Sequence, residues 1–344
     1  MLKWSGALRT MMANVAVEAI ADLSDAEIYV GQASTPGMAF VRRYIHEDGS
    51  YSGVWTSSDL VSKSKVVGEA SERDDTLQII RFVRKDKKDV IMTNWQAHLA
   101  SAIDIMQAVV TADLAYYVRD GVEKADDDAL VAYFAGASGN INLAAPSHEM
   151  RKYRSYVEVG QQLAKIVLET MPVANLKKIN AGKINALTSP EFAVDSDSYT
   201  QERIDQAKEV LAVASNKTKK LELMKQYGFE SDKHINAIAN GSTTSHKINL
   251  YLGALSFGDL AFVAAPYEMH DNNGVQIKNA SKKLGFDTTF VLTCAGGSLG
   301  YVASIEACTI YGGYETYQTD VAPGTAEKLV EEYIRMLGVL KSQG

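Results

Sequence analysis

The chain has 344 residues, of which 46% are apolar and 22% are charged, and its formal net charge is -7. This composition is typical of a folded globular protein with enough apolar material for one large core or two smaller ones. The negative charge and the lack of long Lys/Arg clusters exclude nucleic acid as an expected partner. Cys294 and Cys308 are too few for a disulfide framework or a thiolate zinc site.

No stretch of the sequence reaches the roughly 18 uninterrupted apolar residues of a membrane helix, so no spanning segment is expected. The segment LKWSGALRTMM after Met1 lacks the basic start, the long apolar centre and the cleavage site of a signal peptide. These observations assign neither a compartment nor an oligomeric state.

Apolar residues that recur at i, i+3 and i+4 predict helices. The expected helices span residues 8–22, 112–124, 149–171, 201–214 and 325–341. Thr111 and Thr325 are placed to cap the second and the last of them, and Asp113 falls in the positively charged first turn of the second.

Short runs rich in Val, Ile, Phe and Tyr predict strands. They span residues 27–31, 77–83, 89–95, 130–136, 248–256, 259–265 and 288–294. The charged loop RKDKK joins two of them as in a hairpin, whereas later strands alternate with helices, so a mixed sheet flanked by helices is expected. We predict one α/β domain over residues 1–344, in which residues 186–246 form a polar, helical surface excursion.

Two segments place polar or small residues where a predicted strand ends, which is where α/β folds present their sites. VIMTNWQAHLA delivers His98, a candidate ligand or base, although a buried histidine bonded to a backbone carbonyl is the commoner arrangement. FAGASGNIN, residues 134–142, is a small-residue turn whose N–H groups can approach a ligand or an oxyanion, or else form a plain tight turn.

Two later segments follow the same pattern. LAFVAAPYEMHDNNG delivers Glu268 and His270, of which at most one is expected to point into a given site; a solvated carboxylate is the alternative for Glu268. FVLTCAGGSLGYVAS leads through a glycine-rich turn to Tyr301, whose hydroxyl can bind zinc, although most tyrosines only pack.

Taken in order, these segments resemble the catalytic domain of the neutral/alkaline non-lysosomal ceramidase family, especially its shorter bacterial relatives. The resemblance spans nearly the whole chain. It rests on the combination of five segments: DDTLQIIRFVRKDKKDVIMTNWQAHLA, TADLAYYVRDGVEK, GDLAFVAAPYE, GYVAS with GGYET, and APGTAEKLV.

The resemblance implies a ceramidase-like α/β fold and a zinc ion held by two histidines, a glutamate and a tyrosine. Carried over by motif, the metal ligands are His98, Glu268 and Tyr301. Arg42 matches an arginine of the family that is expected to contact the substrate, with Arg43 as the adjacent alternative. The implied reaction is hydrolysis of an amide or ester, with a small-molecule or lipid-like substrate as partner.

Two positions depart from the family pattern. The first zinc histidine belongs to a Thr-His-Thr-His-Ser-Gly element, and WSG at residues 4–6 holds no histidine, so we expect a truncated or incomplete site unless His148, His246 or His270 substitutes. Asn142 stands where the family has a catalytic serine; it can donate to an oxyanion but is no hydroxyl nucleophile.

The sequence therefore supports three hypotheses. The first is a zinc-dependent hydrolase of an unidentified amide or ester. The second is a noncatalytic or truncated ceramidase-like domain that binds a ligand or partner without turnover. The third is a shared fold that carries unrelated small-molecule chemistry.

Overall fold

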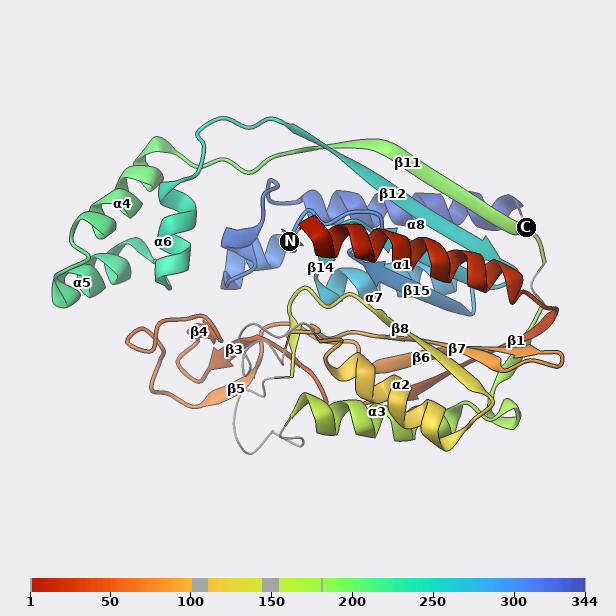
Figure 1. Ribbon diagram of the computed structural model, residues 1–344. Coiled ribbons are helices and arrows are strands. Elements are labelled where there is room, and N and C mark those ends of the chain that lie inside the picture. The colour runs from red at the N-terminus through yellow and green to blue at the C-terminus, as the bar shows by residue number, and fades with distance from the viewer. Residues whose placement is uncertain (1, 101–110, 144–154, 181, 344) are drawn as a thin grey trace.

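The computed structural model describes residues 2–100, 111–143, 155–180 and 182–343. Its elements form four layers, with a helix pair outside each of two central sheets (Figure 1). Helices α2 and α3 pack on the outer face of the first sheet, and α7 and α8 pack on the outer face of the second. A third apolar layer, centred on Ile80 and Phe290, joins the two sheets.

The first sheet has the strand order β10-β1-β6-β7-β8. Its strands are β1 (Ala26–Ser34), β6 (Thr76–Arg84), β7 (Asp89–Trp95), β8 (Ala129–Ala135) and β10 (Lys177–Ile179), with α2 at Leu114–Ala125 and α3 at Tyr156–Thr170. Strands β6 and β7 are antiparallel, whereas β7 and β8 are parallel. The predicted hairpin and the predicted mixed sheet flanked by helices are therefore confirmed.

The second sheet has the strand order β11-β12-β13-β15. Its strands are β11 (Ile184–Asp195), β12 (Lys247–Phe257), β13 (Leu260–Ala265) and β15 (Thr288–Thr293), with α7 at Asp271–Lys283 and α8 at Thr325–Gln343. Strand β13 runs parallel to β15, and α7 is the crossover between them.

The helical surface excursion predicted over residues 186–246 covers fewer residues in the structure. Its first ten residues belong to β11, which pairs antiparallel with β12 over nearly its full length. Strand β11 lies at the edge of the sheet with one face exposed, so its polar side chains resemble those of a surface loop. The helical part then comprises α4 (Gln201–Ala212), α5 (Lys217–Tyr227) and α6 (Asp232–Ala239), which share a small apolar core of their own.

Short strand pairs connect these layers near the predicted site. They are β2 (Phe40–Val41) with β9 (Ile141–Asn142), β14 (Glu268–Met269) with β16 (Tyr301–Val302), and β3 (Arg43–His46) with β4 (Tyr51–Gly53) and β5 (Val66–Glu69). Single helical turns occur at Val173–Asn175, Ala307–Tyr311 and Thr316–Gln318.

The predicted cap of α2 is wrong by two residues. Asp113, not Thr111, is the N-cap: its carboxylate accepts the N–H of Leu114, and Thr111 in turn accepts the N–H of Asp113. Asp113 adopts a positive φ of 52°, which its short polar side chain tolerates better than most. The first six residues of the helix expected at 149–171 lie outside the described residues, and the seventh, Ser155, is its N-cap.

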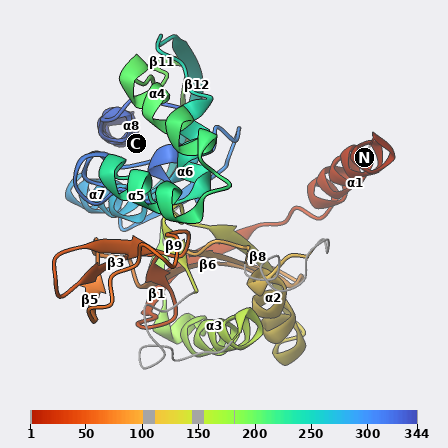
Figure 2. The same cartoon turned by 90° about the vertical axis from the view of Figure 1, so that its left-hand side faces the viewer.

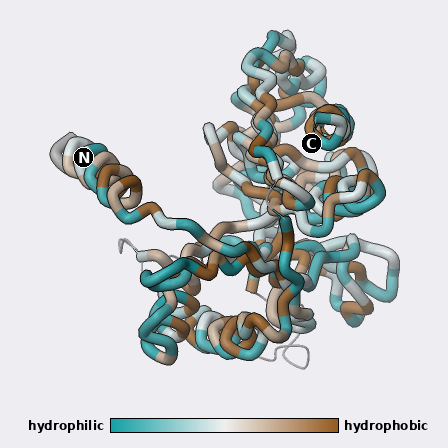
Figure 3. The backbone as a smooth tube through the Cα atoms, turned by 90° about the vertical axis from the view of Figure 1, so that its right-hand side faces the viewer, coloured by the Kyte–Doolittle hydropathy of each residue, from teal (hydrophilic) through white to brown (hydrophobic). Residues whose placement is uncertain are grey.

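Helix α1 (Leu2–Ala21) stands away from the layers (Figures 2 and 3). From Leu8 onward its large apolar side chains are exposed, among them Met11, Val17 and Ile20. No helix among the described residues is long and apolar enough to cross a membrane.

The contact between α2 and α3 depends on a small residue. A Cβ atom at Gly160 would lie 2.7 Å from the backbone oxygen of Leu114 and 2.7 Å from the Cβ of Tyr117.

We expect Gly160→Ala to lower the free energy of unfolding by about 1–3 kcal/mol, because backbone atoms must move. The matched control is Gly338→Ala in α8, where a Cβ meets nothing within 4 Å; it should raise stability by about 0.5–1 kcal/mol. Urea unfolding of both variants measures the difference, and equal effects would contradict the close packing.

A buried carboxyl at the start of α7 should make stability depend on pH. Asp271 is 1% exposed and accepts the N–H of Asp74 at 2.6 Å, and burial raises its pKa from 3.8 to about 8. As the pH rises from the ordinary carboxyl pKa to the raised pKa of Asp271, the folded state keeps a proton that the unfolded state releases. Over this pH range Asp271 should therefore destabilise the protein progressively.

Asp271→Asn removes this titration while keeping an acceptor for Asp74. We expect the loss of unfolding free energy between about pH 5 and about pH 8 to be smaller in the variant, by on the order of 2 kcal/mol. Urea titrations of both proteins at the two pH values measure it. Parallel pH profiles would show that Asp271 does not titrate in this range.

Candidate functional site

Three of the predicted residues meet at one point although they are far apart in sequence. The Nε2 atom of His98 lies 2.9 Å from the Oε2 atom of Glu268 and 3.1 Å from the hydroxyl oxygen of Tyr301. The side chains of His98 and Glu268 are 14% and 27% exposed, so a ligand can reach them. The structure thus brings together one nitrogen and two oxygen donors.

The pairing of β14 with β16 fixes two of these donors relative to each other. The two strands are parallel, and Glu268 and Tyr301 are direct partners in the register. Partners in a ladder point their side chains to the same face, so the carboxylate and the phenol emerge side by side. The N–H of Glu268 donates to the carbonyl of Gly300 at 2.7 Å, which holds the turn before Tyr301 in place.

His98 follows β7, and two backbone carbonyls that contact its Nδ1 atom orient its ring. Its Nδ1 atom lies 2.6 Å from the oxygen of Ser138 and 3.1 Å from that of Ile141. Carbonyl oxygens only accept hydrogen bonds, so Nδ1 carries a proton and Nε2 faces the carboxylate. His98 is therefore bonded to backbone carbonyls, and its Nε2 atom also faces Glu268 and Tyr301. Its role as a ligand or base stays a prediction.

The small-residue turn at residues 136–142 supports the site through its backbone. A Cβ atom at Gly139 would lie 2.8 Å from the oxygen of Met269 and 2.9 Å from that of Glu268. The N–H of Gly139 instead donates to Met269 at 2.7 Å, and that of Ile141 donates to Ser138. These N–H groups are thus already bonded, so of the two readings of the turn, packing explains them better than an oxyanion contact.

Arg42 lies between β2 and β3 in the chain, and its guanidinium lies against the ring of Tyr301. Its guanidinium forms a buried ion pair with Glu315 and donates at 3.0 Å to both the oxygen of Gly139 and the hydroxyl of Tyr301. Arg42 is only 6% exposed, so its contacts are made within the protein. The adjacent Arg43 turns to another region, where it binds Glu230 and the carbonyl of Tyr311.

The charges around the cluster act on its acidic groups in opposite directions. Burial raises the pKa of Glu268, but the polar contacts with His98 and Tyr301 and the charge of Arg42 outweigh it and leave the pKa lowered. Burial raises the pKa of Tyr301, although Arg42 opposes this by stabilising the phenolate. Glu268 is therefore an anion at neutral pH, whereas Tyr301 needs a further positive charge to ionise.

The other histidines considered as substitutes do not join this cluster. His246 pairs with Ser196 at 3.0 Å, and His270 is 1% exposed and accepts the N–H of Ser304. His148 lies outside the described residues. Within the described parts of the chain, no three His, Cys, Asp or Glu side chains form a group that could hold a metal ion; the cluster has two, plus a tyrosine.

Asn142 lies in β9 opposite Phe40. Its side-chain oxygen accepts the N–H of Leu143 at 2.6 Å. Its catalytic role remains a prediction from the family resemblance.

Sequence reasoning missed Glu315, which is 4% exposed and holds Arg42 in place. The signal was present in GGYET, where Gly312 and Gly313, three and two residues before Glu315, adopt positive φ values of 61° and 120°. It also missed Tyr314, which lies edge-on to Tyr301 at a centroid distance of 5.6 Å and beneath Arg42.

No protein-family model matches the chain, and no curated protein sequence matches it. Solved structures do match. Neutral ceramidase from Pseudomonas aeruginosa is 15% identical with a TM-score of 0.62, and the match covers 94% of this chain and 54% of that one. A ceramidase complexed with C2 is 12% identical with a TM-score of 0.58, covering 94% of this chain and 55% of that one.

The chain therefore spans about half the length of the ceramidases that it matches. At these identities the likeness concerns the fold, and it agrees with the fold expected from the sequence segments. The arrangement of two sheets between helix pairs, with His98, Glu268 and Tyr301 gathered at their ends, belongs to a chain with a ceramidase-like fold.

Proposed function

We propose that this chain is a zinc-dependent hydrolase of amide or ester bonds that uses His98, Glu268 and Tyr301 as metal ligands. The observation that carries the proposal is the convergence of their three donor atoms on one accessible point. The substrate class expected from the ceramidase-like fold is a linear, lipid-like amide.

The donor set fits a zinc ion. An imidazole nitrogen 2.9 Å from a carboxylate oxygen needs a positive species between them, which is either a proton on Nε2 or a metal ion. Zinc takes nitrogen and oxygen ligands at about 2.0–2.2 Å, so two of its ligand atoms lie roughly 3–3.5 Å apart. The distances of 2.9 and 3.1 Å from His98 Nε2 approach this spacing.

The residues around the donors support this role. The carbonyl of Ser138 fixes the tautomer of His98 that leaves Nε2 free to bind, as the outer partners of metal-bound histidines commonly do. Arg42 donates to the phenol of Tyr301 and favours the phenolate, and Glu315 holds Arg42 in that position. A bound zinc ion would supply Lewis acidity and an activated water. Glu268 and Tyr301 would orient what binds beside them.

The second candidate is a domain that binds a ligand through this cleft without turnover. Asn142 favours it, because an amide stands where the ceramidase family uses a serine hydroxyl. Three protein ligands without the first histidine of the family also predict weaker metal binding.

Zinc binding tests the metal centre directly. We expect the purified chain, loaded with zinc and dialysed, to retain about one zinc ion per chain, and His98→Ala to retain much less because Nε2 is lost. His246→Ala is the matched control, since His246 bonds Ser196 away from the cluster. Elemental analysis gives the stoichiometry. No retained zinc in the unchanged chain would sink the proposal.

Turnover separates the two candidates. A panel of N-acyl amides and esters of short and long acyl chains should be hydrolysed by the zinc-loaded protein, with rates at least about a hundredfold lower in His98→Ala. Glu315→Gln should lower the rate less, because it acts only through Arg42. Zinc binding with no hydrolysis of any member would favour the binding domain instead.

A further inference from the structure

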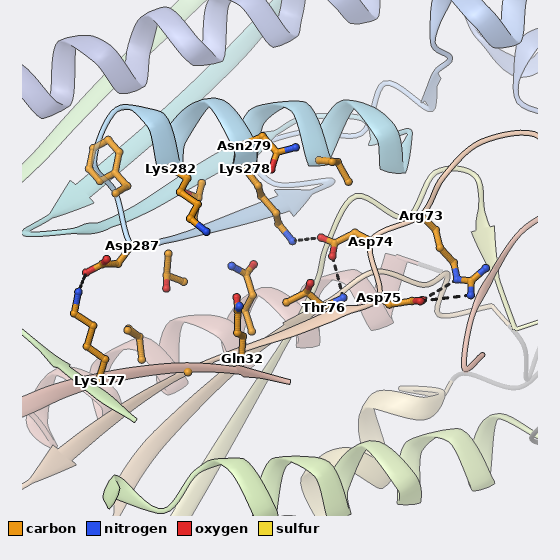
Figure 4. A pocket seen from close by; sticks show the side chains of 17 residues that line it. Gln32, Arg73, Asp74, Asp75, Thr76, Lys177, Lys278, Asn279, Lys282 and Asp287 are labelled. Carbon is orange, nitrogen blue, oxygen red and sulfur yellow. Dashed lines mark hydrogen bonds and ion pairs between the residues drawn. The ribbon is translucent and has the colours of Figure 1, made fainter. Parts of the chain in front are cut away.

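A polar slot of about 580 Å³ lies between α7 and the edge of the first sheet, away from the zinc-ligand cluster (Figure 4). Its floor comes from β1 and β6, one wall from α7, and one end from β15. Its volume lies within the range of small-molecule sites in proteins, about 300–1,000 Å³. His98, Glu268 and Tyr301 do not line it.

Among the charged side chains that line the slot, one cation has no ion-pair partner among the described residues. Each carboxylate has a basic partner: Asp74 pairs with Lys278, Asp75 with Arg73, and Asp287 with Lys177. Lys282 has no ion-pair partner among the described residues, and Figure 4 shows it reaching from α7 into the slot. The slot therefore offers one uncompensated positive charge to a ligand.

The floor of the slot includes a buried amide. Gln78 in β6 lines the slot and is 6% exposed, and its Oε1 atom is buried without a hydrogen-bond partner among the described residues. Because a buried carbonyl oxygen without a donor is destabilising, a ligand or water that donates to it would be favoured. Gln32, its partner across the β1–β6 ladder, lies beside it on the same face.

We propose that this slot binds a small hydroxylated anion, whose anionic group pairs with Lys282 and whose hydroxyl groups donate to Gln78. Hydroxyl side chains of Thr76 and Thr288 also line the slot and suit a hydroxylated ligand. A phosphate and a carboxylate both supply negative charge, so the anionic group is either of these. The proposal is independent of the zinc site.

Four probes separate the parts of this recognition in isothermal titration calorimetry. Glycerol 3-phosphate and glycerate carry both an anion and hydroxyl groups, inorganic phosphate carries only the anion, and glycerol only the hydroxyls. We expect at least one of the first two to bind more tightly than phosphate, and glycerol not to bind. The stronger of the two shows whether the natural anion is a phosphate or a carboxylate.

Three variants test the residues. Lys282→Glu should weaken binding of the hydroxylated anion about tenfold or more, because attraction becomes repulsion. Lys283→Glu makes the same charge change one residue along the exposed face of α7, outside the slot, and should leave binding unchanged. Gln78→Met removes the acceptor and should lower the affinity for glycerol 3-phosphate or glycerate towards that of inorganic phosphate.

The proposal is overturned if neither hydroxylated anion binds at millimolar concentration, or if Lys282→Glu and Lys283→Glu weaken binding equally. Phosphate binding as tightly as the hydroxylated anions would overturn the role of Gln78. Circular dichroism of each variant confirms that it is folded, and zinc content is unaffected by these substitutions if the two sites are separate.

Discussion

The close approach of Gly139 to strand β14 is the constraint on which the site depends. The N–H of Gly139 donates to the carbonyl of Met269, and no side chain fits between the two segments. His98 and its carbonyl supports come from the half of the chain built on the first sheet, whereas Glu268 and Tyr301 come from the other half. The glycine contact is where the two halves meet, so it sets the distance between the histidine and the other two donors.

Much of this arrangement could be predicted from the sequence because its signals are local. Seven predicted strands and five predicted helices match elements of the structure to within a few residues, apart from the start of α1 and of α3. His98, Glu268 and Tyr301 were identified because each follows or begins a strand, and the family pattern named them together. Strand β11 was missed because its exposed face is polar, and a pattern of alternating burial in an edge strand resembles a loop.

What the sequence could not provide are the interactions between distant segments. Glu315 and Arg42 are 273 residues apart, and neither hydropathy nor spacing links a carboxylate to an arginine over that distance. The cap of α2 is a local feature that failed for another reason: Thr111 and Asp113 suit similar roles, and only the backbone conformation decides between them. The described contacts of Arg42 are Glu315, Gly139, Tyr301 and Tyr314, so it supports Tyr301, while its expected contact with the substrate stays a prediction.

The two-residue ladder of β14 and β16 has a consequence for how such sites change over evolutionary time. Because Glu268 and Tyr301 are direct partners in it, a one-residue slip of β16 against β14 would turn the phenol to the opposite face while leaving every residue identity intact. A relative can therefore lose the cluster through a shifted strand register as well as through a replaced side chain. Comparing distant relatives at this position requires the pairing of the two strands as well as the residue types.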